Sequence, residues 1–201
     1  MKRLRSFLRK LALLVACALA AAGGMALMTQ HASAQMSQAA AATRLPAEVA
    51  SELPQAQWSG AARLRFFGFD VYDSRLWVAP GFRASAYAQS PLALELTYLR
   101  SLSGKAIAER SLKEMQRSGR FTPEQEQRWL AAMVEAFPDV GNGDRLTGMH
   151  VPGMGARFWL NGQPRATIRD PEFSRYFFGI WLSEATSEPQ LRASLLAQAA
   201  P

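Results

Sequence analysis

The chain has 201 residues and a formal net charge of +7, from 23 basic and 16 acidic residues. Five of the basic residues and none of the acidic ones lie in positions 1–34, so the rest of the chain carries 18 basic and 16 acidic residues. A balance of +2, without a basic run or a recognised binding motif, excludes nucleic acid as a partner.

The N-terminal segment has the pattern of a secretory signal peptide. Basic residues at positions 2–10 precede an apolar stretch at 11–22, and Ala32-Ser33-Ala34 matches a small-residue cleavage site. We predict cleavage after Ala34, a periplasmic location and no membrane span after cleavage. The alternative is a lipoprotein, because Leu14-Val15-Ala16-Cys17 resembles a lipobox that would carry lipid on Cys17.

Cleavage would also remove Cys17, the only cysteine, and His31, one of two histidines. The mature chain would then have no disulfide and no thiol catalysis, and His150 alone cannot make a typical zinc site. A serine triad would have to use His150, and the sequence has no G-x-S-x-G motif to support one. We therefore expect no metal and no cofactor, and we interpret His150 as a loop or strand-end residue.

Residues 35–54 are rich in Ala, Ser and Gln, which predicts a mobile leader. One domain is expected over residues 55–201, since this length is sufficient for a single hydrophobic core. No internal repeat is visible, so nothing in the sequence suggests a second domain.

Strand patterns dominate the first part of this domain. Residues 63–78 form a long apolar and aromatic run interrupted at Gly68, which we interpret as a β-bulge. Residues 92–100 alternate more regularly, and this alternation places Tyr98 on the same face as three leucines.

Two helices and a strand are predicted next. Ser103 can cap a helix over residues 104–117. Thr122-Pro123-Glu124-Gln125 is a capping box with proline at the first helical position, and the helix that it begins ends at Pro138. Residues 144–151 again have a strand pattern.

The C-terminal part combines a hairpin with two helices. Asn161-Gly162 is a strong two-residue turn signal between strands at 157–160 and 163–168. Asp170-Pro171-Glu172 predicts the start of a helix, because Asp caps and Pro favours the first position. One face of this helix is apolar, formed by Phe173, Phe177, Ile180 and Trp181. A last helix is predicted after Ser187-Glu188-Pro189-Gln190.

The order of strands, two helices, strands and two helices predicts an α+β domain with antiparallel strands and helices on one face. Short segments in this order and spacing resemble the chalcone isomerase-like family, whose bacterial members often carry an export signal. They are Gly68-Phe69-Asp70-Val71-Tyr72, Leu76-Trp77-Val78, Leu96-Thr97-Tyr98, Phe137-Pro138-Asp139-Val140, Asn161-Gly162 and Phe178-Gly179-Ile180-Trp181-Leu182. The resemblance covers about residues 60–196 and implies the chalcone isomerase fold, a large antiparallel sheet with a layer of helices on one face.

The resemblance also suggests site residues. In plant enzymes of the family an arginine near the start of the sheet steers a phenolate-like nucleophile, and in fatty-acid-binding relatives an arginine and a tyrosine hold a carboxylate. These roles imply Arg63, with Arg65 as second choice, and Tyr98 as ligand-binding residues. The residues alone leave open that Arg63 pairs with an internal carboxylate and that Tyr98 is a core residue. No motif here matches the hydroxyl-bearing residues of the plant active site, so no catalytic residue is assigned.

Three functions follow as hypotheses. The first is binding of a small apolar acid, such as a fatty acid, with an arginine at the head group. The second is an intramolecular lyase of the chalcone isomerase type, acting on a phenolic ligand without metal or cofactor. The third is a non-catalytic domain that binds a protein partner, for which an exposed apolar patch would be the sign.

Overall fold

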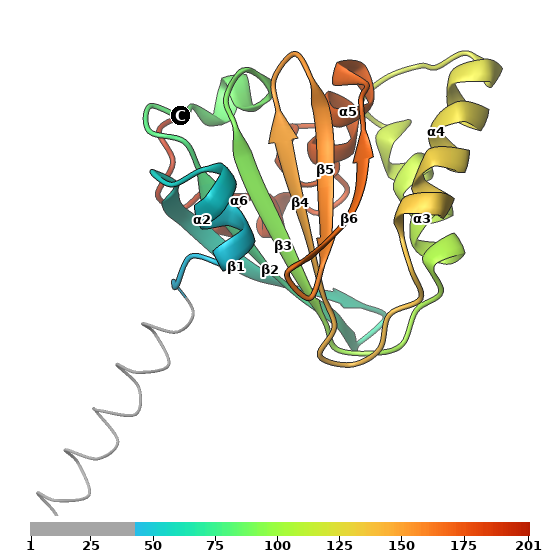
Figure 1. Cartoon of the computed structure of the whole chain (residues 1–201), viewed down its shortest axis with the longest axis horizontal. Coiled ribbons are helices and arrows are strands. Elements are labelled where there is room, and N and C mark those ends of the chain that lie inside the picture. Colours follow the sequence, from blue (N-terminus) through green and yellow to red (C-terminus); the bar gives the residue numbers. More distant parts are fainter. Residues whose placement is uncertain (1–42) are drawn as a thin grey trace, which may run out of the picture. The chain divides into compact units, whose positions relative to one another are not determined.

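Six antiparallel strands form one sheet, and their order in the sheet is their order in the chain (Figure 1). The computed structural model describes residues 43–201, so the predicted signal peptide, its cleavage site and Cys17 lie outside the described residues. The strands are β1 (Gln57–Phe66), β2 (Phe69–Val78), β3 (Leu92–Tyr98), β4 (Arg145–Val151), β5 (Gly155–Leu160) and β6 (Gln163–Ile168).

Two tight turns form the hairpins at the two edges of the sheet. The predicted turn at Asn161-Gly162 is confirmed, with φ of 52° and 83° joining β5 to β6. The interpretation of residues 63–78 as one strand with a bulge at Gly68 is wrong, because a second hairpin divides this run into β1 and β2. Its turn is Phe67-Gly68, with φ of 48° and 81°, and positive φ at both residues is what a type I′ turn requires.

The described residues form six helices, three of which begin at the capping residues predicted from the sequence. They are α2 (Ala47–Glu52), the 3-10 helix η1 (Ala84–Gln89), α3 (Gly104–Met115), α4 (Pro123–Ala136), α5 (Pro171–Leu182) and α6 (Pro189–Leu195). Ser103 caps α3, Thr122 and Gln125 form the predicted capping box of α4, and Asp170 caps α5. The helix α6 follows Glu188, whose side chain makes no capping bond.

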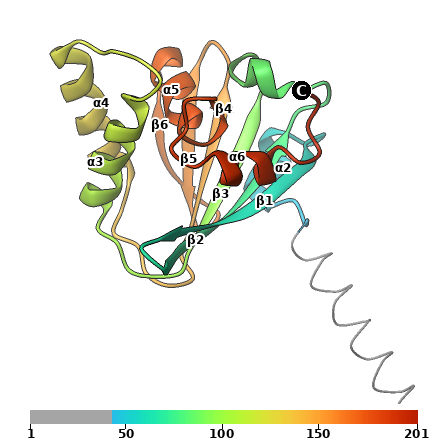
Figure 2. The same cartoon turned by 180° about the vertical axis from the view of Figure 1, so that it is seen from behind.

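The main core lies between one face of the sheet and the layer of helices, as predicted. The helix α6 packs on β1 and β2, α5 packs on β4 and β5, and α3 lies between α5 and α4. Figure 2, seen from behind, shows α5 and α6 in front of the strands. Strand alternation directs Leu76, Leu94, Leu96 and Phe158 into this core, where they are buried in one cluster with the apolar side of α5.

The opposite face of the sheet is covered by the short helix α2. Its Val49 is fully buried in a second, smaller cluster with four sheet residues: Trp77, Ala93, Met149 and Trp159. The prediction of a mobile leader over residues 35–54 is therefore wrong for α2, because Val49 contributes to the core of a folded unit that begins at Leu45.

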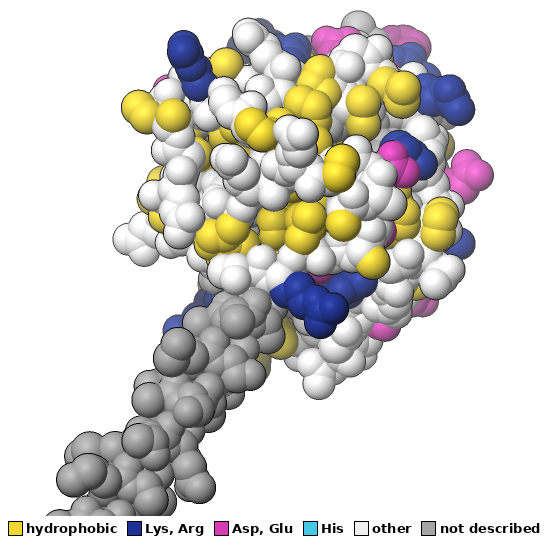
Figure 3. All heavy atoms as spheres, turned by 60° about the vertical axis from the view of Figure 1, so that its left-hand side comes forward, with side chains coloured by type: hydrophobic (Ala, Val, Ile, Leu, Met, Phe, Trp, Pro, Cys, Tyr) yellow, Lys and Arg dark blue, Asp and Glu magenta, His cyan; other side chains and the backbone are white. Residues whose placement is uncertain are grey.

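Buried charges attach α2 to the same face. Glu48 of α2 accepts a hydrogen bond from Thr147 and forms an ion pair with Arg145, 3.0 Å away. Glu95, fully buried on β3, pairs with Arg75 and Arg145, and burial raises the pKa of its carboxyl group. On the surface around α2 and β1, hydrophobic side chains are interspersed with polar groups and form no single continuous face (Figure 3).

Candidate functional site

A cavity of about 350 Å³ lies on the helix-covered side of the sheet, bounded by α3, α5 and the start of α6. This is at the small end of the range of about 300–1,000 Å³ that ligand sites occupy. Its wall is mainly apolar, and it includes Leu64, Leu96, Leu102, Ile107, Phe137, Leu146, Phe177, Ile180 and Trp181. An apolar molecule would therefore find apolar contacts on several sides at once.

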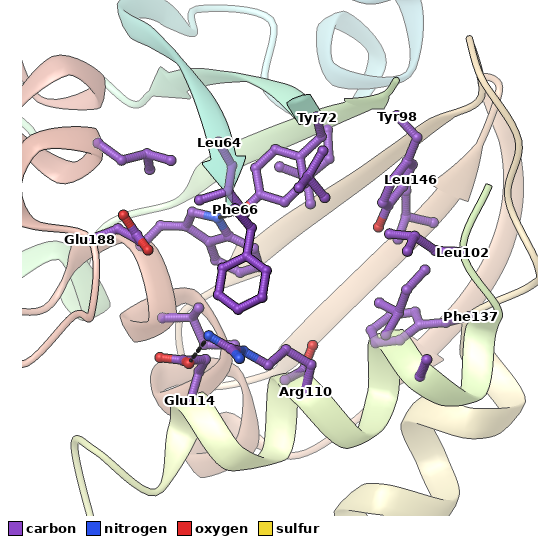
Figure 4. A pocket seen from close by; sticks show the side chains of 18 of the residues that line it. Leu64, Phe66, Tyr72, Tyr98, Leu102, Arg110, Glu114, Phe137, Leu146 and Glu188 are labelled. Atoms are coloured by element: carbon purple, nitrogen blue, oxygen red, sulfur yellow. Dashed lines mark hydrogen bonds and ion pairs between the residues drawn. The ribbon is translucent and has the colours of Figure 1, made fainter. Parts of the chain in front are cut away.

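The strand register brings the sheet side of this wall together. Leu64 of β1 pairs with Tyr72 of β2, and Tyr72 pairs with Tyr98 of β3, so these three residues form a row across the sheet. Phe66 lies two residues beyond Leu64 on the same face and is half exposed, so it marks the mouth of the cavity. Figure 4 shows Phe66 in the middle of the view, between the two tyrosines and Arg110 of α3.

Two tyrosine hydroxyls differ in their bonding inside the cavity. The Tyr72 hydroxyl accepts a hydrogen bond of 2.9 Å from the indole nitrogen of Trp181. The Tyr98 side chain is 2% exposed, and its hydroxyl forms no hydrogen bond with any described residue. Burial raises the pKa of both phenols, so both stay protonated and can donate a hydrogen bond to a ligand oxygen.

The mouth of the cavity carries charged groups from α3 and from the end of β3. Arg110 is half exposed and donates to Glu114 across 2.7 Å, one turn further along α3. Its guanidinium also lies 5.4 Å from the centre of the Phe66 ring. Arg100 lies 5.5 Å from the ring centre of Phe69 and forms no ion pair within residues 43–201. An anionic group at the mouth would therefore find two arginines beside it, in a cavity whose lining also includes the carboxylates of Glu114 and Glu188.

The structure does not bring the two arginines suggested by sequence to this cavity. Arg63 lies on the opposite face of β1 from Leu64, where it bonds Asp73 (2.6 and 2.8 Å) and Asp70 (2.9 Å) in solvent. Arg65 bonds Asp70 on that face too, at 2.7 Å. Neither arginine therefore lines this cavity, and their place at a ligand head group stays a prediction. The alternative of pairing with a carboxylate of the chain describes Arg63. Tyr98 does line the cavity.

The arginines of the mouth gave no distinctive signal in the sequence. Arg110 and Glu114 are four residues apart on a helix, a spacing that ordinarily indicates a surface ion pair. Their place at a cavity follows only from the packing of α3 against α5, which leaves space between α3 and the hairpin of β1 and β2. No local pattern contains that information.

His150 is not part of the cavity. It lies near the end of β4, as predicted, but is buried, with Nδ1 2.6 Å from Ser174 Oγ and Nε2 2.9 Å from the carbonyl oxygen of Ala88. A carbonyl only accepts, so Nε2 carries the proton and Nδ1 accepts from the hydroxyl. Burial lowers the pKa of His150, and Ser174 is fully buried, so this pair supports the packing of α5 and η1 rather than a reaction.

Two other classes of site find no support in the part of the chain that the structure describes. No three His, Cys, Asp or Glu side chains gather there to hold a metal ion. No helix in residues 43–201 is long and apolar enough to cross a membrane.

Comparisons with known proteins identify the family. The model of the family described as chalcone isomerase-like matches residues 37–197, so the chain belongs to that family, and the predicted fold is confirmed. A fatty-acid-binding protein of Arabidopsis thaliana has a similar structure, with a TM-score of 0.56 and 11% identity over 71% of this chain and 87% of that one. At that identity the likeness shows the fold alone. Comparison with curated proteins found no similar sequence.

Proposed function

We propose that the protein binds a small apolar acid of the fatty-acid type in the cavity. The observation that carries this proposal is the combination of a mainly apolar cavity with two arginines, Arg100 and Arg110, at its mouth. The fold shared with a fatty-acid-binding protein agrees with it. The apolar chain would lie between the sheet and α5, and the carboxylate would stay at the mouth.

Electrostatics favours this orientation. A carboxylate moved into an apolar interior without a cation loses its hydration, whereas at the mouth it keeps partial contact with water. Arg110 has five N–H donors, and the ion pair with Glu114 leaves donors available to a ligand. Inside the cavity the unbonded hydroxyl of Tyr98 can donate to a ligand oxygen or to an ordered water.

The test compares Arg110→Gln with Arg63→Gln. Both variants remove one ion-paired arginine, but only Arg110 lines the cavity. Loss of charge-assisted hydrogen bonds of about 1.5–3 kcal/mol should weaken dodecanoate binding about 10- to 100-fold in Arg110→Gln. Calorimetric titration would show this, and mass spectrometry of organic extracts from the native protein would identify the natural ligand. Equal losses in both variants, or no binding by the wild type, would overturn the proposal.

A second candidate function is the intramolecular lyase reaction. The observation in its favour is the pair of neutral hydroxyls, Tyr72 and Tyr98, adjacent across β2 and β3 in one apolar cleft. Such donors can stabilise negative charge developing on a carbonyl oxygen. Incubation with a hydroxychalcone, followed by the loss of its visible absorbance, tests this function separately from binding.

We further propose that the protein is exported by the predicted signal peptide. The basic segment, the apolar stretch and the Ala32-Ser33-Ala34 site support this proposal. The intact mass of the protein purified from a Gram-negative host distinguishes the cleaved soluble form from the lipoprotein. A chain beginning at Gln35 supports a soluble periplasmic protein, and a diacylglyceryl adduct on Cys17 supports the lipoprotein alternative.

A further inference from the structure

The turn between β1 and β2 exposes three aromatic side chains, which we call the aromatic tip: Phe66, Phe67 and Phe69. They are 46%, 86% and 64% exposed, and they account for three of the five large hydrophobic side chains that are exposed among the described residues. The other two, Val134 on α4 and Met154 in the turn after β4, come from elements without another such residue. The aromatic tip is therefore the one place in residues 43–201 where exposed large apolar groups are neighbours in sequence.

Phe67 occupies a backbone conformation at the tip that is unfavourable for phenylalanine. Phe67 has φ of 48°, in the left-handed region that bulky residues rarely adopt. The other two-residue hairpin of this chain has the same geometry, with φ of 52°, and uses Asn161 at the equivalent position. Asn is the favoured residue for such a turn, so Phe67 costs the fold stability that Asn would not. An exposed residue that is locally unfavourable points to an interaction outside the fold.

The surroundings of the tip indicate the kind of partner. Arg100 and Arg110 lie over the Phe69 and Phe66 rings, so two guanidinium groups border the aromatic tip. Both arginines also line the cavity mouth, and Figures 1 and 2 place this hairpin at the end of the sheet beside α3. Rings that end in solvent with cations beside them match the interfacial zone of a bilayer, where aromatic groups insert and basic groups meet phosphate.

We propose that the aromatic tip docks the protein on an anionic membrane surface, with the cavity mouth facing the lipid. A membrane fits better than a protein partner, because a stable protein interface uses about 20–30 residues a side and the tip is a single projecting turn. This inference goes beyond ligand binding and does not rest on it, since docking requires only the tip and its arginines. An apolar acid leaving the bilayer would then enter the cavity without crossing water.

Flotation of the exported chain with phospholipid vesicles tests the proposal. The probes are vesicles of phosphatidylglycerol with phosphatidylcholine, and vesicles of phosphatidylcholine alone. Phe67→Asn should reduce partitioning onto the anionic vesicles about tenfold, because one nearly fully exposed phenyl ring is lost. The same variant should unfold at higher urea concentration than the wild type, since Asn relieves the backbone cost. Each arginine at the surface adds about fivefold, so neutral vesicles should bind more weakly than anionic ones by that factor or more.

A matched control is Met154→Gln, which removes an exposed apolar side chain of 49% exposure at the opposite end of the sheet. It should leave vesicle partitioning unchanged. Dodecanoate affinity without vesicles should be unchanged in Phe67→Asn, since Phe67 does not line the cavity, and this separates failure of docking from failure of binding. Equal vesicle binding by Phe67→Asn and wild type would overturn the proposal. So would wild-type self-association that Phe67→Asn abolishes, because the tip would then bind a second copy.

Discussion

Asp170 connects α4 to α5, the helix that supplies part of the cavity wall, and its removal gives a quantitative test of the fold. Its Oδ1 accepts hydrogen bonds of 3.0 Å from the backbone N–H groups of Glu172 and Phe173, and so caps α5. Its Oδ2 accepts a bond of 2.8 Å from the indole nitrogen of Trp129 on α4, a side chain that is almost fully buried. One carboxylate therefore fixes the start of α5, which supplies Phe177 and Trp181 to the cavity wall.

Asp170→Ala should lower the free energy of unfolding in two ways. Loss of a helix cap costs about 0.5–2 kcal/mol, and an unsatisfied buried donor costs about 1–3 kcal/mol. We expect a total loss of about 2–4 kcal/mol in the free energy of unfolding, which for a domain of this size lowers the melting temperature by roughly 4–16 °C. Asp170→Asn should lose less, because its single amide oxygen can still cap α5 although its amino group cannot accept from Trp129.

Urea denaturation of these variants in wild-type and Trp129→Phe backgrounds measures the two parts separately. Without the indole donor, Asp170→Asn should cost less than about 1 kcal/mol, and the coupling energy of the cycle should equal the indole bond. An Asp170→Ala variant as stable as wild type, or a coupling energy near zero, would refute the assignment of Asp170 to both helices.

Three further predictions concern the site and its supports. Tyr98→Phe should change the urea midpoint little, because the hydroxyl has no protein partner, but should weaken a ligand oxygen contact and so dodecanoate or phenolic-acid binding about 3- to 10-fold in titration. Gly60→Ala should destabilise by about 1–3 kcal/mol in urea, since its Cβ would lie 2.1 Å from the carbonyl oxygen of Ser194 on α6. His150 has a folded-state pKa lowered by burial, so the unfolded chain binds more protons and stability should fall as pH drops from about 7 to about 5.5. His150→Gln should flatten that dependence in urea titrations at the two pH values, and an unchanged slope would contradict the assignment.

Local signals in the sequence predicted much of the fold because the relevant interactions span only a few residues. The Asn161-Gly162 turn, the capping box at Thr122 and the cap at Asp170 each involve groups within four positions of one another. Such signals also fixed the order of strands and helices, from which the α+β class follows. Their success explains why the C-terminal half was predicted in more detail than the N-terminal half.

The predictions that were wrong concern segments whose structure is determined by long-range packing. The turn at Phe67-Gly68 was missed because phenylalanine is an unusual first residue of a type I′ turn. Without that turn the faces of β1 could not be assigned, and both faces of residues 63–78 carry large apolar groups. The pairing of Arg63 with Asp73, which lies directly opposite in the register, could therefore not be predicted. The helix α2 has no side-chain cap and only six residues, so tertiary burial of Val49, rather than local propensity, holds it.

Several departures from the rules of stable packing lie near the hairpin of β1 and β2. An apolar cavity of about 350 Å³ leaves the side chains that line it without packing partners on one side. The Tyr98 hydroxyl has no hydrogen-bond partner among the described residues, and Phe67 holds a backbone angle that Asn would hold more easily. On the α2 face, three buried polar atoms also lack a hydrogen-bond partner: Trp77 Nε1, Glu95 Oε2 and Arg145 Nε. The open cavity, the unbonded hydroxyl and the unfavourable backbone angle lie near one hairpin, whereas the turns and caps described above follow local preference. This pattern is expected where selection acts on binding.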